Sequence, residues 1–206
     1  MKKVEPRKQA NQDRAKFTVD SIIEATTLLL KEKGLKKLTT NKIVDKAGVS
    51  IGSLYQYFPG KEAILAIVME RQFKKDLAKF KVKLDSLTPE EFTLKEAVHE
   101  AVVFFMKDFS AQSSVYKELM FSILTIKSLK FTLKHDQLME EYLADFIKRF
   151  KKEVREDLDL AFFTFFIQYT VKGLKLGMTF SNKDNLVDKT IEQLTVIIYG
   201  HVKKHD

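Results

Sequence analysis

The sequence contains no cysteine, which excludes disulfides, zinc sites built on thiolates and cysteine nucleophiles. A chain without cysteine fits a reducing compartment, so we expect a cytoplasmic protein. Glycine occurs 7 times and proline 3 times in 206 residues, too few turn formers for the many short connections of an all-β fold. Hydrophobic residues make up 45% of the chain, which is enough for a sizeable core. The composition therefore favours an all-α fold of one domain or of two unequal ones.

Long apolar runs are also lacking. The most apolar stretch, residues 160–180, is interrupted by Gln168, Lys172 and Lys175 before it reaches the ~18 to 20 apolar residues that a membrane crossing needs. Residues 1–17 are polar and basic and contain no apolar segment of the kind found in secretory signals. We therefore expect no secretory signal and no membrane-spanning segment.

The sequence shows no arrangement of residues that is typical of catalysis. It has no GxGxxG motif, no phosphate loop and no glycine-flanked serine nucleophile. Glu96 and His99 have the spacing of a di-iron helical bundle, but such a site needs a second copy, and no other histidine has Asp or Glu three residues before it. We expect no enzyme activity, no metal site and no cofactor.

Positive charge is concentrated near the N-terminus. The formal net charge is +8, and residues 1–62 hold 13 Lys or Arg against 7 Asp or Glu, whereas residues 63–206 hold 23 against 21. A concentrated basic region favours a polyanionic partner, most often nucleic acid, with an anionic membrane surface as the alternative. Residues 1–17 lack helical periodicity and are predicted to form a flexible basic arm, which is either a solvated tail or a DNA contact.

Residues 39–62 have the pattern of two short helices around a glycine turn. Thr39 or Thr40 can cap the first helix, and Gly48 can adopt the left-handed conformation that ends it. Ser50 then stands at the N-cap of the second helix, which Pro59 and Gly60 stop. Together with an amphipathic helix from Thr18 to Gly34, this pattern predicts a helix-turn-helix domain of three helices.

The second short helix has a polar side suited to DNA. Leu54 and Phe58 are predicted to face inward. The outward set then comprises Ser53, Tyr55, Gln56 and Tyr57. Glutamine can read an adenine edge and serine several base edges, whereas tyrosine hydroxyls suit phosphates. Gly52 lets the backbone approach a groove closely, and Lys61 at the start of the next helix can clamp a phosphate.

This motif resembles the signature of the tetracycline-repressor (TetR) family over residues 18 to about 70. The residues that carry the resemblance are Ala47-Gly48-Val49-Ser50, Gly52-Ser53-Leu54-Tyr55-Gln56-Tyr57-Phe58 and Lys61-Glu62. Ser53 stands where the family often has threonine. The motif and the resemblance together predict a DNA-binding set of Thr39, Thr40, Asn41, Ser50, Gly52, Ser53, Tyr55, Gln56, Tyr57 and Lys61. The resemblance also implies a variable helical C-terminal domain that dimerises and binds an effector.

We expect about nine helices in three parts. These parts are a basic arm (residues 1–17), a helix-turn-helix domain (18–62) and an effector-binding and dimerisation domain (63–206). A stripe from Leu65 to Leu84 predicts one long helix that continues from the small part into the large one. Thr88 and Pro89 have the pattern of a helix start. Further helices are expected near residues 116–126, 131–154, 157–180 and 185–203.

Phenylalanine occurs 17 times, and 15 of these residues lie beyond residue 62. Core packing is the simplest explanation for any single one of them. The functional alternative is an apolar pocket for a small lipophilic effector. The candidate pocket residues are Phe105, Phe109, Phe121, Leu124, Phe165 and Tyr169.

The last two predicted helices are candidates for a homodimer interface. Residues 160–167 are apolar almost all round, so they need cover on more than one side. Gly173 and Gly177 permit close helix approach, and Leu194 and Ile198 lie on an apolar stripe of the last helix. Burial within one chain is the alternative. A dimer would place two motif helices in successive major grooves of a palindromic operator.

These patterns predict a sequence-specific DNA-binding transcriptional regulator, namely a repressor that a ligand releases from double-stranded DNA. The alternative is a helical protein-interaction or anionic-membrane-surface module with a basic N-terminus.

Overall fold

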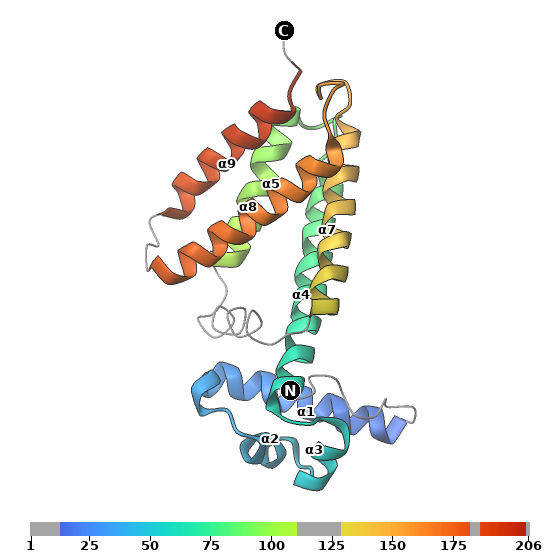
Figure 1. Ribbon diagram of the computed structural model, residues 1–206, viewed down its shortest axis with the longest axis vertical. Coiled ribbons are helices and arrows are strands. Elements are labelled where there is room, and N and C mark those ends of the chain that lie inside the picture. The colour runs from blue at the N-terminus through green and yellow to red at the C-terminus, as the bar shows by residue number, and fades with distance from the viewer. Residues whose placement is uncertain (1–12, 111–128, 182–185, 205–206) are drawn as a thin grey trace. The chain divides into compact units, whose positions relative to one another are not determined.

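The computed structural model describes residues 13–110, 129–181 and 186–204 (Figure 1). The regular elements in these ranges are helices. The described residues also contain one isolated antiparallel bridge, between Val154 and Lys203. The predicted all-α fold class is therefore confirmed. The helix expected near residues 116–126 lies outside the described residues. Internal contacts divide the described chain into two units, residues 13–73 with 129–131, and residues 74–110 with 132–181 and 186–204.

The first unit consists of α1 (Asp13–Lys33), the 3₁₀ turn η1 (Leu35–Lys37), α2 (Thr40–Ala47), α3 (Ile51–Tyr57) and the first half of α4 (Lys61–Ser86). Helix α1 begins at Asp13, so residues 13–17 are helical and do not form part of an arm. Asp13 lies in the first turn, where a carboxylate interacts favourably with the helix dipole. The rest of the predicted arm lies outside the described residues.

A single apolar core holds the first unit together. Its fully buried side chains come from each of the four helices and include Ile22, Ile43, Leu54, Phe58 and Ile64, each 0% exposed. Because one stripe of each helix is buried in this core, the opposite faces of the short helices are left at the surface.

The second unit consists of the second half of α4, α5 (Leu94–Ser110), most of α7 (Leu129–Arg149), α8 (Leu160–Ser181) and α9 (Leu186–Val202). The first three residues of α7 belong to the first unit. Helix α5 packs against α9, and α8 approaches α9 where the Phe163 ring stacks on His201 at 5.4 Å (Figure 1). The core of this unit includes Leu84, Leu94, Met106, Phe150 and Val202. Among the described helices, none is long and apolar enough to cross a membrane.

Helix α5 begins later than predicted. Residues 89–91 form a turn and the helix starts at Leu94, because Thr93 and Glu96 make a capping box. The backbone and hydroxyl of Thr93 donate to the Glu96 carboxylate at 2.9 and 2.8 Å, and these hydrogen bonds lower the pKa of Glu96. Predicted boundaries also shift elsewhere, since α7 ends at Arg149 and α8 begins at Leu160.

Candidate functional site

Side-chain caps set the ends of the two short helices. Thr39 accepts a hydrogen bond from the Lys42 amide at 3.3 Å, and Ser50 accepts one from the Ser53 amide at 3.0 Å. Gly48 lies between the helices at φ 66° and ψ 33°, a left-handed conformation that disfavours a side chain. The predicted caps and glycine turn are thus confirmed, and they fix the direction in which α3 leaves α2.

Helix α3 has one buried and one exposed face. Leu54 and Phe58 are fully buried, as predicted. Tyr57 was expected to face outward, but it is only 9% exposed and belongs to the core. The reason is helical geometry, because a residue three positions after Leu54 lies on the same face as Leu54. The exposed residues of α3 are Ile51, Gly52, Tyr55 and Gln56.

Gly52 and Ser53 lie at the start of this exposed face. A Cβ added to Gly52 would meet only Ser50 Oγ, at 3.8 Å, so packing within the chain leaves room for a side chain there. The Ser53 hydroxyl shares a hydrogen bond with the Ser50 hydroxyl at 2.8 Å. A hydroxyl in one such bond still has an acceptor lone pair for a further partner.

The start of α4 lies beside the residues that lead into α2. Lys61, the first residue of α4, is half-buried, and its Nζ donates to the Leu38 carbonyl at 3.4 Å. Thr39 and Asn41 follow Leu38 closely and are exposed, whereas Thr40 is half-buried. The structure therefore brings Lys61 next to the predicted DNA-contacting residues at the start of α2.

Further lysines surround this surface. Lys36 and Lys37 are exposed in η1, and Lys42 extends its Nζ to the Lys37 carbonyl at 2.9 Å. Lys46 forms an ion pair with Glu32 at 2.9 Å. Basic groups outnumber acidic ones here, which favours an anionic partner.

The three candidate pocket residues whose side chains are described differ in burial. Phe105 is half-buried, with its ring 4.9 Å from Phe80 and 3.2 Å from the Lys175 Nζ. Phe165 and Tyr169 are instead 50% and 43% exposed. The side chains of Phe109, Phe121 and Leu124 lie outside the described residues.

The candidate dimer residues separate into two groups. Gly173 and Gly177 are exposed on α8, and a Cβ added to either would meet no atom within 4 Å. Leu194 and Ile198 are buried in the core of their own chain, at 2% and 7% exposure. Their side chains are therefore already covered within the chain, because α5 packs against α9.

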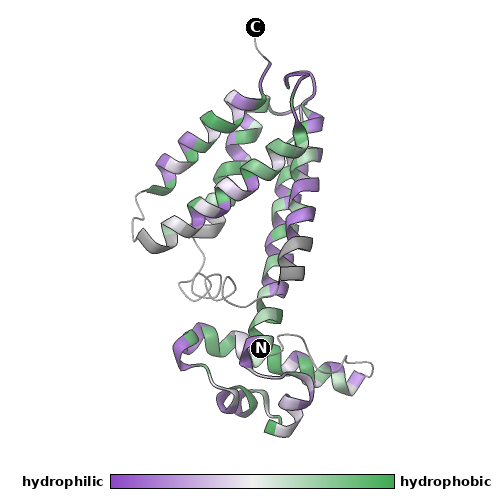
Figure 2. Cartoon of the chain, viewed as in Figure 1, coloured by the Kyte–Doolittle hydropathy of each residue, from purple (hydrophilic) through white to green (hydrophobic). Residues whose placement is uncertain are grey.

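An exposed apolar face nevertheless exists on α8 and α9. It consists of Phe162, Phe165, Phe166 and Tyr169 on α8 and of Val196 and Ile197 on α9. Two ring pairs lie along α8, Phe162 with Phe166 at 6.1 Å and Phe165 with Tyr169 at 4.7 Å. Figure 2 shows the hydrophobic residues along α8 and α9. Large exposed apolar patches on soluble proteins usually mark an interaction site.

A buried carboxylate connects α7 and α8. Asp136 is 5% exposed, accepts a hydrogen bond from the Tyr169 hydroxyl at 3.1 Å and pairs with Lys172. Burial alone would raise the pKa of Asp136, but hydrogen bonds from His135, Lys172 and Tyr169 lower it below its usual value. Burial, and then the charge of Asp136, raises the pKa of Tyr169. The carboxylate is therefore held ionised.

Helix α8 itself has two buried polar residues, Thr164 and Gln168. Gln168 is 5% exposed, and within the described chain neither its Nε2 nor its Oε1 has a hydrogen-bond partner. The hydroxyl of Thr164, one turn earlier, donates to the Leu160 and Ala161 carbonyls at 3.0 and 3.1 Å. An unsatisfied buried amide costs about 1–3 kcal/mol.

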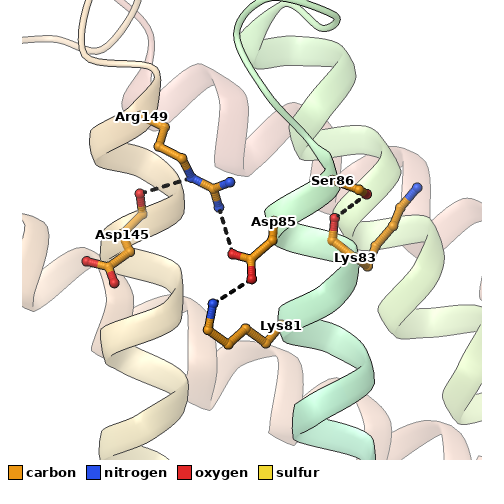
Figure 3. Close-up of polar contacts among 6 residues, drawn as sticks. All are labelled: Lys81, Lys83, Asp85, Ser86, Asp145 and Arg149. Atoms are coloured by element: carbon orange, nitrogen blue, oxygen red, sulfur yellow. Dashed lines mark hydrogen bonds and ion pairs between the residues drawn. The ribbon is translucent and has the colours of Figure 1, made fainter.

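A polar cleft of about 360 Å³ lies between α4 and α7 (Figure 3). Three of its charged groups pair with one another, since Asp85 lies 2.5 Å from Lys81 and 3.9 Å from Arg149. Lys81 also lies over the Tyr142 ring at 5.3 Å. These pairings leave the cleft without a clear preference for a charged ligand. Within the described ranges, no group of three or more His, Asp or Glu residues is placed to hold a metal ion.

Comparison with known sequences identifies the first unit. Residues 22–68 match the model of the family described as bacterial regulatory proteins, tetR family. The chain is 27% identical over 103 residues to the HTH-type transcriptional regulator CymR of Pseudomonas putida, covering 50% of this chain and 51% of the relative. It is 27% identical over 134 residues to the fatty acid metabolism regulator protein of Bacillus subtilis, covering 64% of each chain. The chain thus spans about half to two thirds of the length of these relatives.

Solved structures share the fold over almost the whole chain. Thermus thermophilus FadR, described as a TetR-family transcriptional repressor in complex with lauroyl-CoA, superposes with a TM-score of 0.68 at 17% identity. The match covers 91% of this chain and 96% of that one. At this identity the likeness concerns the fold alone.

Proposed function

Through the match of its residues 22–68, the chain belongs to the tetR family of bacterial regulatory proteins. We therefore propose that it is a sequence-specific DNA-binding transcriptional regulator. The observation that carries the proposal is the exposed face of α3, where Tyr55 and Gln56 stand at the surface. The carboxamide of Gln56 can donate to and accept from one adenine edge. Lys61 and the amides at the start of α4 bind backbone phosphate.

The sequence predicts that Tyr57 contacts DNA, but in this proposal Tyr57 has a structural role. Because its ring is packed in the core of the first unit, it supports α3 from the inside and does not form part of the groove-facing surface. Thr39, Asn41 and Lys42 are exposed at the start of α2 and are suited to phosphate contacts.

The regulator acts as a homodimer on a palindromic operator. The exposed apolar face of α8 and α9 covers its counterpart on a second copy, with Val196 and Ile197 in the role predicted for Leu194 and Ile198. Gly173 and Gly177 lie on the exposed side of α8 and allow the two copies to approach closely.

A small lipophilic effector controls DNA binding in this proposal, and the protein is a cytoplasmic repressor. A fold neighbour is described as a repressor in complex with lauroyl-CoA, which supports an apolar ligand for this fold. The ligand binds in the second unit and prefers a conformation whose paired motifs no longer match the groove spacing. Helix α4 supplies residues to both units and is one covalent connection between them.

Selection of bound fragments from random double-stranded DNA, followed by gel-shift titration, tests the DNA-binding proposal. We expect Gln56→Ala to relax sequence preference at one position, whereas Lys61→Ala weakens binding to every sequence and reduces the salt slope by about 1. Gln137→Ala and Lys151→Ala, at exposed positions of the second unit, are the matched controls. Unchanged DNA binding in both test variants contradicts the assignment. Binding to anionic liposomes without any sequence preference would favour a membrane-surface module instead.

Sedimentation of Ile197→Glu and Phe165→Glu tests the dimer. Both variants place a charge on the apolar face of α8 and α9, so we expect dissociation to monomers. Val82 is 70% exposed on α4, a helix that contributes no residue to that face, and Val82→Glu is the control. A dimer that survives both test substitutions would show that the interface lies elsewhere.

A further inference from the structure

Gln168 differs from every other buried polar residue described in this chain. The other four are Thr26, Asp136, Thr164 and Thr195. Each of them has a partner, since Asp136 binds Lys172 and Tyr169 and the three threonine hydroxyls donate to backbone carbonyls. Only Gln168 keeps both atoms of its amide unpartnered in the described structure.

The polar groups near Gln168 along α8 are already used. The hydroxyl of Thr164 is bonded within the helix, and Lys172 and Tyr169 are held by Asp136. Phe163, Ile167 and Val171 form the adjacent apolar stripe of the core. An apolar side chain at position 168 would fit this stripe without leaving an amide unsatisfied, so the fold itself has no use for a glutamine there.

Two turns beyond Gln168, the same face of α8 meets aromatic side chains of the second unit. Lys175 follows Gln168 by seven residues, so the two share a face of the helix. The Lys175 Nζ lies 3.2 Å from the centre of the Phe105 ring, and Phe105 packs on Phe80 at 4.9 Å. An apolar ligand that extends from Gln168 toward Lys175 would reach these aromatic rings.

We propose that Gln168 is the polar anchor of an effector site, and that the effector is an apolar molecule with one neutral group that both donates and accepts a hydrogen bond. Phenols, alcohols and primary amides belong to this class. The inference rests on the proposed function, because it assumes that the second unit binds a ligand. Nε2 of Gln168 donates to the oxygen of the ligand, and Oε1 accepts from its O–H or N–H.

The charges near Gln168 explain why the ligand group is neutral. Asp136 and Lys172 pair with each other, so neither is left to compensate a buried charge on a ligand. A carboxylate placed against the Gln168 amide would lose its hydration, and Lys175, the other cation on this face, lies two helical turns away at the Phe105 ring. A hydroxyl or amide makes the same hydrogen bonds without that cost.

A pair of probes that differ only in a hydroxyl tests the proposal. We would titrate the full-length protein with 4-propylphenol and with propylbenzene and follow binding by saturation-transfer NMR. The wild type should bind the phenol about tenfold more tightly, and Gln168→Met should bind the two probes equally. Methionine keeps the length and unbranched shape of glutamine, so the variant preserves packing. Gln137→Met, at an exposed position of α7, should retain the wild-type preference.

Two further measurements separate this inference from the general function. Without a probe, Gln168→Met should melt at a higher temperature than the wild type, because it removes the unsatisfied amide. Its affinity for the DNA fragments selected with the wild type should be unchanged. A wild type that fails to bind DNA contradicts the proposed function but leaves the probe titration valid. The inference itself is overturned if the wild type does not prefer the phenol, if Gln168→Met keeps the preference, or if Gln168→Met lowers the melting temperature.

Discussion

The two units of this chain use polar and apolar side chains in opposite ways. In the first unit, hydroxyls such as those of Thr39 and Ser50 cap helices at the surface. Of the large apolar side chains of α3, Leu54 and Tyr57 are buried, and Ile51 and Tyr55 are exposed. In the second unit, Gln168 and Asp136 are buried, whereas aromatic rings of α8 are exposed. The core of the first unit is complete within one chain, and its exposed face is the one that we propose binds DNA. The second unit has features that the proposed dimer and ligand would explain.

The largest expected effect tests the completeness of the first core. Leu54 is fully buried in α3, and Leu54→Ala should lower the free energy of unfolding by about 3 kcal/mol. Ile51 lies on the same helix but is 40% exposed, so Ile51→Ala should cost less than about 0.5 kcal/mol. Urea denaturation followed by circular dichroism measures both. Equal costs would mean that α3 is not anchored through Leu54.

The buried carboxylate of the second unit should give the next largest effect. Asp136→Asn should lower the free energy of unfolding by about 2 kcal/mol, because it removes the charge that pairs with Lys172. The loss is not larger because solvent around the partly exposed Lys172 screens the ion pair. The pKa of Asp136 is lowered in the folded state, so its contribution is complete above the unfolded pKa of about 4 and is lost as the pH falls through the folded pKa.

Urea titrations from neutral pH down to the acid limb check this dependence. The stability difference between the wild type and Asp136→Asn should shrink as the medium is acidified below about pH 4. Asp145→Asn, at an exposed position of α7, is the control and should show a difference close to zero. A difference that grows with acidification would reverse the assigned sign.

Two glycine substitutions should act in opposite directions in the two units. Gly48 has a φ of 66°, so Gly48→Ala should destabilise the first unit by about 1 kcal/mol. Gly173 lies inside α8 with open space around it, so Gly173→Ala should stabilise the helix by up to about 1 kcal/mol. Thermal denaturation measures both changes. Sedimentation of Gly173→Ala adds a readout, because a weaker dimer would place Gly173 at the interface between copies.

The smallest effect concerns the ion pairs of the α4–α7 cleft. Asp85 and Arg149 lie 3.9 Å apart with partly exposed side chains, so Arg149→Met should change the free energy of unfolding by less than about 1 kcal/mol. Lys151→Met, at an exposed position nearby in sequence, is the comparison. A loss several times larger would show that the pair holds the two helices together.

Features that depend on adjacent residues could be predicted from the sequence. The caps at Thr39 and Ser50 and the turn at Gly48 involve groups within a few positions, so side-chain chemistry and backbone preference are sufficient to locate them. The start of α5 was predicted wrongly although both competing signals were visible. Pro89 suits a first helical turn, but the capping box of Thr93 and Glu96 prevails because it satisfies several backbone and side-chain groups at once.

Orientation was harder to predict than helix formation. Leu54 and Phe58 alone predict a narrow buried stripe on α3, which leaves Tyr57 on the outward side. The stripe in the structure is wider and includes Tyr57, which follows Leu54 by three residues. On α9 the sequence shows apolar residues on more than one side. It does not say that Leu194 and Ile198 face α5, which leaves Val196 and Ile197 exposed.

The sequence by itself determined that the chain is helical, where the short helices of the motif begin and end, and that positive charge gathers around them. These properties follow from local periodicity, capping and composition. Only the tertiary structure decided which apolar residues remain exposed on α8 and α9 and that the Gln168 amide is buried without a partner among the described residues. Burial depends on which distant segments pack against a helix, and a stripe of residues on one helix does not contain that information.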